Sequence, residues 1–300
     1  MMSTSSHLEN TPIASIDPAT ALGPVRLTVS DLDHSRAFYE RAIGLRATEL
    51  DDGTIGLGAA GRPALIELRG DSSAPRLNRR APGLYHLAML LPTRVDLAFA
   101  LARLVQTQWP LDGASDHLVS EALYLSDPDG NGIEIYRDRP RTEWRYDGGR
   151  LEMSTLPLDL NDLVGQLREA TELQAEVPTG TRIGHVHLQV AELSEAEAFY
   201  HGVLGFDVVV RGYPGALFVS AGGYHHHIGL NTWHSAGAAP APAGMVGLRS
   251  FTIELPDERE LAAVLARVDA AGLERGREPK GALVRDPWGT GVVLSAPAPA

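Results

Sequence analysis

The segment VRLTVSDLDHSRAFYERAIGLRA at residues 25–47 is mirrored later in the chain by VHLQVAELSEAEAFYHGVLGFDV at residues 186–208. Two further pairs of segments repeat in the same order, namely GLYHLAMLLPTRVDLAFALARL (83–104) with GLRSFTIELPDERELAAVLARV (247–268), and SDPDGNGIEIY (126–136) with RDPWGTGVVLS (285–295). Self-similarity that keeps its order over such distances indicates a duplicated domain.

The repeat divides the chain of 300 residues into two domains of ordinary size. We expect the first domain at residues 16–146 and the second at residues 181–300. The connector between them, residues 147–180, is charged, and its segment LNDLVGQLREA predicts one helix. Residues 1–15 contain neither the basic nor the apolar region of a secretion signal, so we expect a disordered tail there.

Each domain divides again into two similar quarters. In every quarter an alternating strand leads through Ser or Asp into a helix with apolar periodicity, and short strands follow, separated by Gly and Asp turns. The sequence therefore predicts an α+β fold built from four βαβββ modules.

The strand HVHLQV at residues 185–190 shows where chemistry could lie. Because side chains on a strand alternate, Val186, Leu188 and Val190 form one face, and His185, His187 and Gln189 form the other. We expect the apolar face to cover the helix and the polar face to line a cavity. A histidine on a strand is more often solvated or hydrogen-bonded than a ligand, so its position alone does not make it a metal ligand.

Composition excludes several classes of function. The chain has no cysteine, so disulfides and thiolate metal sites are impossible, any metal must be held by His, Asp or Glu, and we expect a cytoplasmic protein. A net charge of −12 without a basic cluster argues against nucleic acid as a partner. No apolar run approaches the roughly 20 residues of a membrane span, so we expect no helix that crosses a membrane.

The quartered pattern resembles the vicinal oxygen chelate superfamily. Two motifs carry the resemblance, H-x-x-L-x-V-x-E-L from His185 and D-P-x-G-x-x-hydrophobic-E from Asp127 to Glu134. It covers nearly the whole chain outside the tail and the connector. In that superfamily two βαβββ modules form a half-open barrel, so the resemblance implies two tandem domains of this kind, with metal ligands on the first and last strands of the modules.

The ligand positions that the resemblance assigns are mostly occupied by other residues. The first-strand positions are Pro24, His86, His185 and Ser250, and the last-strand positions are Glu67, Glu134, Gly229 and Val293. Modules two and three together would supply His86, Glu134 and His185, whereas modules one and four would leave the second cavity without metal. Modules two and three could face each other within one chain or across two subunits, so a homo-oligomer stays open.

Two histidines and one carboxylate are the ligand set of the ring-cleaving extradiol dioxygenases of this superfamily, which leaves positions at iron for a catecholate and dioxygen. The resemblance thus implies an Fe(II) enzyme, with Mn(II), Ni(II) or Zn(II) as alternative ions, that inserts both atoms of O2 into a small aromatic diol and yields a ring-opened semialdehyde.

Further residues match the catalytic positions of those dioxygenases. Tyr124 stands ten residues before Glu134, and His117 lies in a loop upstream of it. In the run His225–His227, counting back by two from Gly229 predicts that His225 and His227 face the cavity. The resemblance implies His227 as the acid/base, with Tyr124 and His117 as its catalytic partners, and His225 and Trp233 as substrate-binding residues. An exposed edge strand is the alternative interpretation of the run.

Two other functions stay open. Pairing of modules one and two would place Glu67, His86 and Glu134 together in a glyoxalase-like isomerase or lyase, which would favour nickel or zinc, although Pro24 leaves it one ligand short. The third possibility is a small-molecule binding protein without catalysis, whose cavity would be apolar and free of metal.

Overall fold

The computed structural model describes residues 15–167, 174–278 and 281–297. Within them the chain forms four modules of one strand, one helix and three strands, in the order that the repeat predicts. The predicted α+β fold of four βαβββ modules is therefore confirmed. The predicted tail lies outside the described residues except for Ser15.

The four modules share one order of elements. Module one comprises β1 (Ala21–Val29), α1 (Leu32–Phe38) with a π-helical turn at Tyr39–Ile43, β2 (Arg46–Glu49), β3 (Ile55–Gly58) and β4 (Ile66–Gly70). Module two comprises β5 (Gly83–Leu90), α2 (Arg94–Gln106), β6 (Gly113–Asp116), β7 (Ser120–Ser126) and β8 (Gly132–Asp138). Module three comprises β12 (Arg182–Gln189), α4 (Leu193–Glu197) with a π-helical turn at Ala198–Val203, β13 (Asp207–Val210), β14 (Ala216–Ser220) and β15 (Ile228–Asn231). Module four comprises β16 (Gly247–Glu254), α5 (Glu258–Ala270), β17 (Gly276–Glu278), β18 (Gly281–Arg285) and β19 (Gly291–Ser295).

The connector holds short elements. They are a 3-10 turn at Arg141–Glu143, β9 (Tyr146–Asp147), β10 (Arg150–Leu151), β11 (Leu156–Pro157) and α3 (Leu160–Gly165). Helix α3 starts at the predicted residue because Asp159 accepts hydrogen bonds from the first backbone N–H groups. The last part of the predicted helix, residues 168–170, lies outside the described residues. None of the described helices is long and apolar enough to cross a bilayer.

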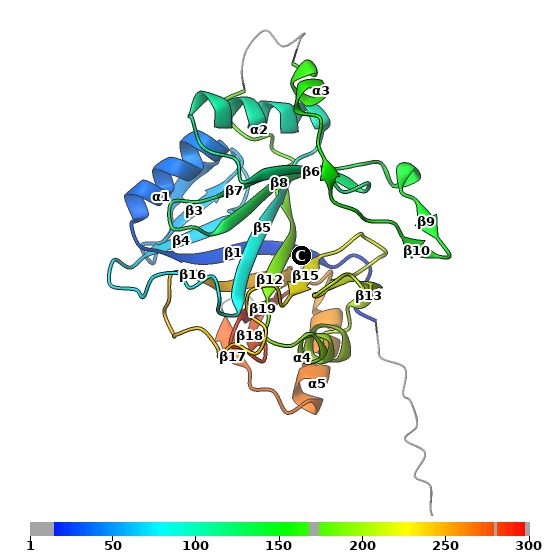
Figure 1. Ribbon diagram of the computed structural model, residues 1–300. Coiled ribbons are helices and arrows are strands. Elements are labelled where there is room, and N and C mark those ends of the chain that lie inside the picture. The colour runs from blue at the N-terminus through cyan, green and yellow to red at the C-terminus, as the bar shows by residue number, and fades with distance from the viewer. Residues whose placement is uncertain (1–14, 168–173, 279–280, 298–300) are drawn as a thin grey trace, which may run out of the picture.

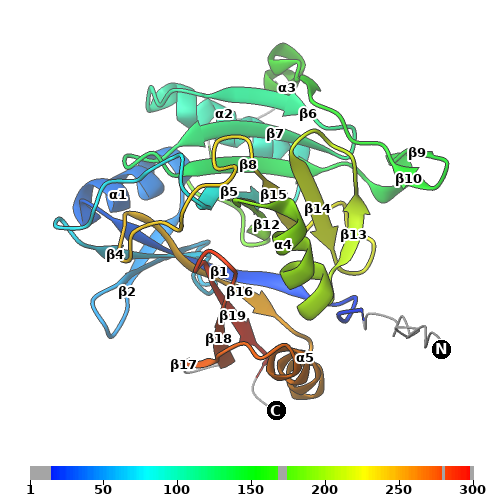
Figure 2. The ribbon, with the colours of Figure 1, turned by 60° about the horizontal axis from the view of Figure 1, so that its bottom comes forward.

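Each sheet takes one module from each repeat. Modules two and three form a nine-stranded sheet in the order β11-β6-β7-β8-β5-β12-β15-β14-β13, and modules one and four form an eight-stranded sheet in the order β17-β18-β19-β16-β1-β4-β3-β2. Figure 2 shows the larger sheet above the smaller one. The glyoxalase-like pairing of modules one and two is therefore wrong for this chain, because Glu67 lies in a different sheet from His86 and Glu134.

The first strands of the modules meet in the middle of each sheet. β5 pairs with β12 and β1 pairs with β16, both antiparallel, while each first strand runs parallel to the last strand of its own module. In Figure 1 helices α1 and α2 lie above these central strands, and α4 and α5 lie below them. The central strands of modules two and three thus bring the predicted ligand positions side by side within one chain.

One apolar core joins both sheets and their helices. Leu27 of β1, Leu87 of β5 and Val186 of β12 are fully buried in it, together with one face of α2 that includes Leu97 and Leu104. On the central strands the alternate residues face away from this core. His185 and His187 of β12 are also buried, because the curled sheet closes around its own concave face.

Candidate metal centre

The three predicted ligands stand on neighbouring strands of the larger sheet. Glu134 of β8 and His185 of β12 both lie opposite Ala88 of β5, one on each side, and His86 precedes Ala88 by two residues on the same face. Ala88 is fully buried, and its methyl group is the only side chain between the two outer ligands at that level of the sheet. The register of three strands therefore gathers the group.

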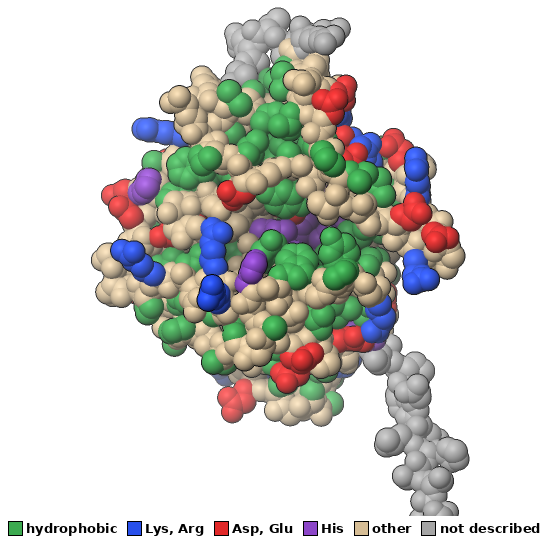
Figure 3. Space-filling view, in the orientation of Figure 1, with side chains coloured by type: hydrophobic (Ala, Val, Ile, Leu, Met, Phe, Trp, Pro, Cys, Tyr) green, Lys and Arg blue, Asp and Glu red, His purple; other side chains and the backbone are tan. Residues whose placement is uncertain are grey.

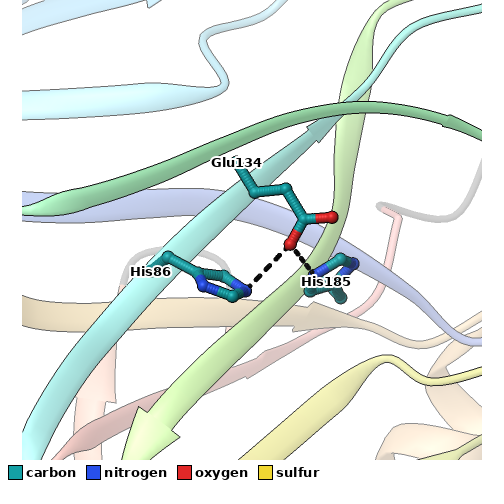
Figure 4. Close-up of side chains that lie close together, drawn as sticks. All are labelled: His86, Glu134 and His185. Carbon is teal, nitrogen blue, oxygen red and sulfur yellow. Dashed lines mark hydrogen bonds and ion pairs between the residues drawn. The ribbon is translucent and has the colours of Figure 1, made fainter. Parts of the chain in front are cut away.

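The ligand atoms converge on one point. Glu134 Oε2 lies 3.0 Å from His86 Nε2 and 3.1 Å from His185 Nε2. Figure 4 shows both imidazoles turned toward that single oxygen. Their ligand atoms all lie within 4.8 Å of one another, and the three residues are buried. His185 meets the geometry of a hydrogen bond to Glu134, whereas His86 Nε2 is a buried nitrogen with no hydrogen-bond partner.

The charges of the three ligand side chains suit the binding of a cation. Burial raises the pKa of the Glu134 carboxyl, but the charge and hydrogen bond of His185, with the nearby imidazole of His86, outweigh burial and hold this pKa well below its usual range. Burial lowers the pKa of His185 to about 4. At neutral pH the group therefore offers a carboxylate and a neutral imidazole, which are the protonation states that a metal ion requires.

The donor set fits a divalent first-row metal ion. Two imidazole nitrogens and one carboxylate oxygen on one side of an ion leave its other positions open, as in non-haem iron sites. The unpartnered Nε2 of His86 is a buried lone pair for which a metal ion would supply the missing partner. The residues present therefore fit one divalent metal ion.

A cavity of about 530 Å³ opens beside the three ligands. Its walls include the aromatic side chains of Tyr85, Tyr124, Tyr213, Phe218 and Trp233. Figure 3 looks onto the cavity and shows histidine side chains inside a hollow bordered by hydrophobic ones. Trp233, predicted to bind substrate, is 40% exposed at this wall. The cavity is large enough for a substituted aromatic ring next to the ligands.

Tyr124 and His117 line the cavity as a hydrogen-bonded pair. Tyr124 on β7 lies directly opposite Glu134 on β8, and its hydroxyl is 2.6 Å from His117 Nε2. His117 Nδ1 is 2.7 Å from the Ser154 carbonyl, which can only accept, so Nδ1 carries a proton. In the neutral tautomer that this bond selects, Nε2 accepts the Tyr124 hydroxyl proton. Burial and the nearby Glu134 raise the pKa of Tyr124 well above its usual range.

The histidine run departs from the predicted alternation. His226 lines the cavity, while the expectation that His225 and His227 line it is wrong. His227 Nδ1 lies 3.0 Å from Ser220 Oγ and 3.2 Å from the Ala221 backbone N–H, away from the cavity. The reason is local, because β15 begins only at Ile228 and His225–His227 lie in bends and irregular backbone before it, to which the two-residue period of a strand does not extend.

His226 is positioned by hydrogen bonds that run through His225 to Asp138. Its ring centroid lies 4.1 Å from that of His185, and its Nδ1 lies 2.8 Å from His225 Nδ1. His225 Nε2 in turn lies 3.0 Å from Asp138 Oδ1. Because that carboxylate accepts the proton on His225 Nε2, His225 Nδ1 accepts from Nδ1–H of His226 in the neutral tautomer. The other nitrogen of His226, Nε2, is then left with its lone pair.

His187 is a cavity residue to which the sequence assigned no role. It is buried, its Nε2 has no hydrogen-bond partner, and its ring centroid lies 5.0 Å from that of His86. Gly229 lies opposite it on β15, where a Cβ atom would come within 2.9 Å of the His187 ring. Strand alternation predicts that His187 shares the polar face of its strand with His185. The sequence therefore indicated where the side chain points, but the packing of the strands is needed to show that its ring reaches the cavity.

Comparison with known proteins agrees with this geometry. Residues 21–135 and 182–294 match the model of the Glyoxalase/Bleomycin resistance protein/Dioxygenase superfamily. A protein of Bacillus subtilis (strain 168) named catechol-2,3-dioxygenase is 45% identical over 279 residues, which cover 92% of this chain and 96% of that protein.

Solved structures share the fold at low sequence identity. Glyoxalase I from Zea mays superposes with a TM-score of 0.56 at 15% identity, covering 93% of this chain and 92% of that chain. The cppA protein from Streptococcus pneumoniae TIGR4 gives a TM-score of 0.56 at 10% identity, covering 92% of this chain and 98% of that chain. Since the family model matches both repeats, this chain belongs to the Glyoxalase/Bleomycin resistance protein/Dioxygenase superfamily.

Proposed function

We propose that this chain is an extradiol dioxygenase that cleaves the ring of a catechol-type substrate at a mononuclear Fe(II) site. The observation that carries the proposal is the convergence of His86, Glu134 and His185 beside a cavity with aromatic walls. The relative named catechol-2,3-dioxygenase supports the same activity at 45% identity. Both atoms of O2 would enter the substrate, and the product would be a ring-opened semialdehyde.

The metal would be held by the three converging side chains. Bound Fe(II) would supply the one-electron chemistry that lets dioxygen react with an aromatic diol. Iron fits this proposal better than Zn(II), which has no redox chemistry, while Mn(II) and Ni(II) are alternatives that metal analysis would separate. The cytoplasmic location and a homo-oligomeric state stay predictions.

His226 is the residue we assign to proton transfer, in place of His227. It lines the cavity beside the ligand His185, whereas His227 is turned toward Ser220. Since Nδ1 of His226 is engaged by His225, the nitrogen that can take a proton from a substrate hydroxyl and return it is Nε2. Asp138 acts through His225 and positions this tautomer.

Tyr124 and His117 would orient the substrate. The Tyr124 hydroxyl donates a hydrogen bond to His117 Nε2, so its oxygen keeps lone pairs that can accept a hydrogen bond from a diol hydroxyl. Trp233 and Phe218 line the same cavity and offer faces and edges against which an aromatic ring can pack. These contacts fix the ring relative to the ligands and limit the entry of water.

The proposal is tested by oxygen uptake. Anaerobic protein loaded with Fe(II) and given catechol should consume oxygen on exposure to air and turn yellow, and Glu134→Ala should do neither, because the ion loses its only carboxylate ligand. Glu67→Ala is the matched control. Glu67 occupies the last-strand position in the other sheet, where it pairs with Arg26 at 2.7 Å, so this variant should keep the activity.

A contrary result has a clear form. No oxygen uptake across a series of substituted catechols, with Fe(II) bound, would remove the dioxygenase assignment and leave the fold intact. Loss of activity in Glu67→Ala with retention in Glu134→Ala would move the reaction to the other sheet.

A further inference from the structure

A second cavity, of about 820 Å³, is lined by residues of both sheets and of the loops beside them. Its lining includes Arg69 at the end of β4, Arg249 on β16 and Arg285 at the end of β18. No acidic side chain lies within 4 Å of these guanidinium groups among the residues that the structure describes. Arg69 and Arg285 are exposed, and Arg285 donates to the Gly289 carbonyl. Arg249 is half-buried, so its missing carboxylate partner is the one that needs an explanation.

The smaller sheet has different chemistry at the positions that match the metal ligands, and those positions do not line the second cavity. In the larger sheet His187 lies opposite Gly229 on one side and His86 on the other. In the smaller sheet Arg26 lies opposite Glu67 and Ser250 in the same way. An ion pair of 2.7 Å between Arg26 and Glu67 thus stands where the metal cavity has an imidazole and a glycine. No ligand set for a metal exists at these positions.

Arg249 occupies a bulge that turns its side chain into the cavity. Ser250 pairs with Arg26 and Leu248 pairs with Leu27, so Arg249 between them has no partner on β1. Tyr85 has the same place in the larger sheet, between His86 and Leu84, and it lines the metal cavity. Bulges redirect a side chain next to binding sites in this way.

The cavity leaves polar groups of its walls unsatisfied. Arg249 Nε is buried and has no hydrogen-bond partner, and burial, with the charges of Arg69 and Arg26, lowers the pKa of Arg249. Gln189, at the end of β12, is 4% exposed, and its Oε1 is also unpartnered. Asp71 lines the cavity too, but its carboxylate accepts from the backbone N–H and hydroxyl of Ser73. The buried N–H of Arg249 therefore lacks an acceptor that an anion would supply, whereas Gln189 Oε1 is itself an acceptor and is not satisfied by an anion.

The apolar walls of the cavity also indicate what kind of group should carry the negative charge. Leu77, Leu84, Leu248 and Trp288 contribute apolar surface to the same cavity. Guanidinium groups bind carboxylates through paired hydrogen bonds, and an apolar wall favours a ligand that carries hydrocarbon behind the charge. We propose that this cavity is a second, non-catalytic site that binds a small organic carboxylate with an apolar body, anchored by Arg249 and Arg69.

Calorimetric titration with benzoate tests the proposal on the metal-loaded protein. Benzoate should bind the unmodified protein, and Arg249→Gln and Arg69→Gln should each weaken its binding about ten-fold or more, because a charge-assisted hydrogen bond is lost. Glu134→Ala is the control for binding at the metal cavity and should leave benzoate affinity unchanged. Arg69 is exposed, so its variant keeps the test open if Arg249→Gln does not fold.

Three results would overturn the assignment. The first is the absence of benzoate binding at millimolar concentration. The second is a loss of benzoate affinity in Glu134→Ala with none in the arginine variants, which would locate the anion at the metal cavity. The third is equal affinity for inorganic phosphate and benzoate, because the apolar wall would then make no contribution. None of these results depends on ring cleavage.

Discussion

In the run His225–His227, the direction in which each side chain points decides which histidine can contact a substrate. Consecutive side chains here have three different environments: His225 bonds Asp138, His226 lines the cavity and His227 bonds Ser220. A strand would have sent the first and third to one face. The run lies in bends and irregular backbone before β15, and its middle histidine has the ring nearer to His185, at 4.1 Å between centroids against 6.0 Å for His225.

Substitution of these histidines separates the two assignments. His226→Gln should lower kcat by about 10² to 10⁴ while the protein keeps its metal, because the proton-transfer group is lost and the three ligands stay. His227→Gln, the matched control, should keep kcat close to that of the unmodified enzyme. Steady-state kinetics with iron content measured on the same samples checks both. A larger loss in His227→Gln than in His226→Gln would return the acid/base role to His227.

The pH dependence of stability has a contribution from His227. Burial, then the charges of His225 and His185, lower its pKa from 6.5 to about 3. Between these values the unfolded chain binds a proton that the folded chain does not, so the stability falls as pH falls from 6.5 toward 3.

His227→Gln should reduce the slope of the unfolding free energy against pH in this window by up to about 1.4 kcal/mol per pH unit. Urea unfolding at several pH values measures it. An unchanged slope would mean that the ring is already protonated in the folded protein, or that its burial is relieved.

At the scale of strands, the register of β8, β5 and β12 brings the three side chains of the site together. Glu134 and His185 reach the same point because both lie opposite Ala88, and the alternation of each strand turns them to the same face. That alternation could be predicted from the sequence, whereas the resemblance to the superfamily assigned the ligand positions. The helix starts could be predicted in part. Asp31 and Asp257 cap α1 and α5 as expected. The caps of α2 and α4 are Thr93 and Glu192 instead of the expected Ser or Asp.

Ala88→Leu should therefore damage the metal centre. The larger side chain would fill the space between the two outer ligands, so metal affinity should fall about ten-fold or more, with a cost of about 1 to 3 kcal/mol in stability. Thr252→Leu is the matched control, because Thr252 lies next to Val293 in the smaller sheet as Ala88 lies next to Glu134 in the larger one. It should carry the packing cost without loss of metal. Metal titration of both proteins decides the matter, and equal affinities would contradict this role of Ala88.

At the scale of the whole molecule, the two repeats are interleaved rather than set side by side. Each sheet joins a module of the first repeat to a module of the second through the central pairs β5–β12 and β1–β16. The predicted boundaries at residues 16–146 and 181–300 describe the repeats of the sequence, and the sheets cut across them. The cavity beside His86, Glu134 and His185 thus needs both halves of the chain.

Separation of the halves should abolish metal binding. A fragment of residues 1–173 holds His86 and Glu134 but lacks His185, and its strands β1 and β5 would expose the edges that β16 and β12 cover. We expect this fragment and its complement, residues 174–300, to self-associate or aggregate alone and to recover iron binding when produced together. Size-exclusion chromatography with metal analysis measures this. A monomeric first fragment with the iron affinity of the whole chain would contradict the interleaved arrangement.

The sequence alone determined the four modules and the faces of their strands, because these follow from local periodicity and from a repeat within the chain. The ligand positions came from the resemblance to the superfamily, which names places on those strands. Tertiary structure decided which modules share a cavity, because strand pairing between residues a hundred positions apart depends on the packing of the whole core. It also decided that His226 rather than His227 lies beside His185, because irregular backbone has no period from which the direction of a side chain can be predicted.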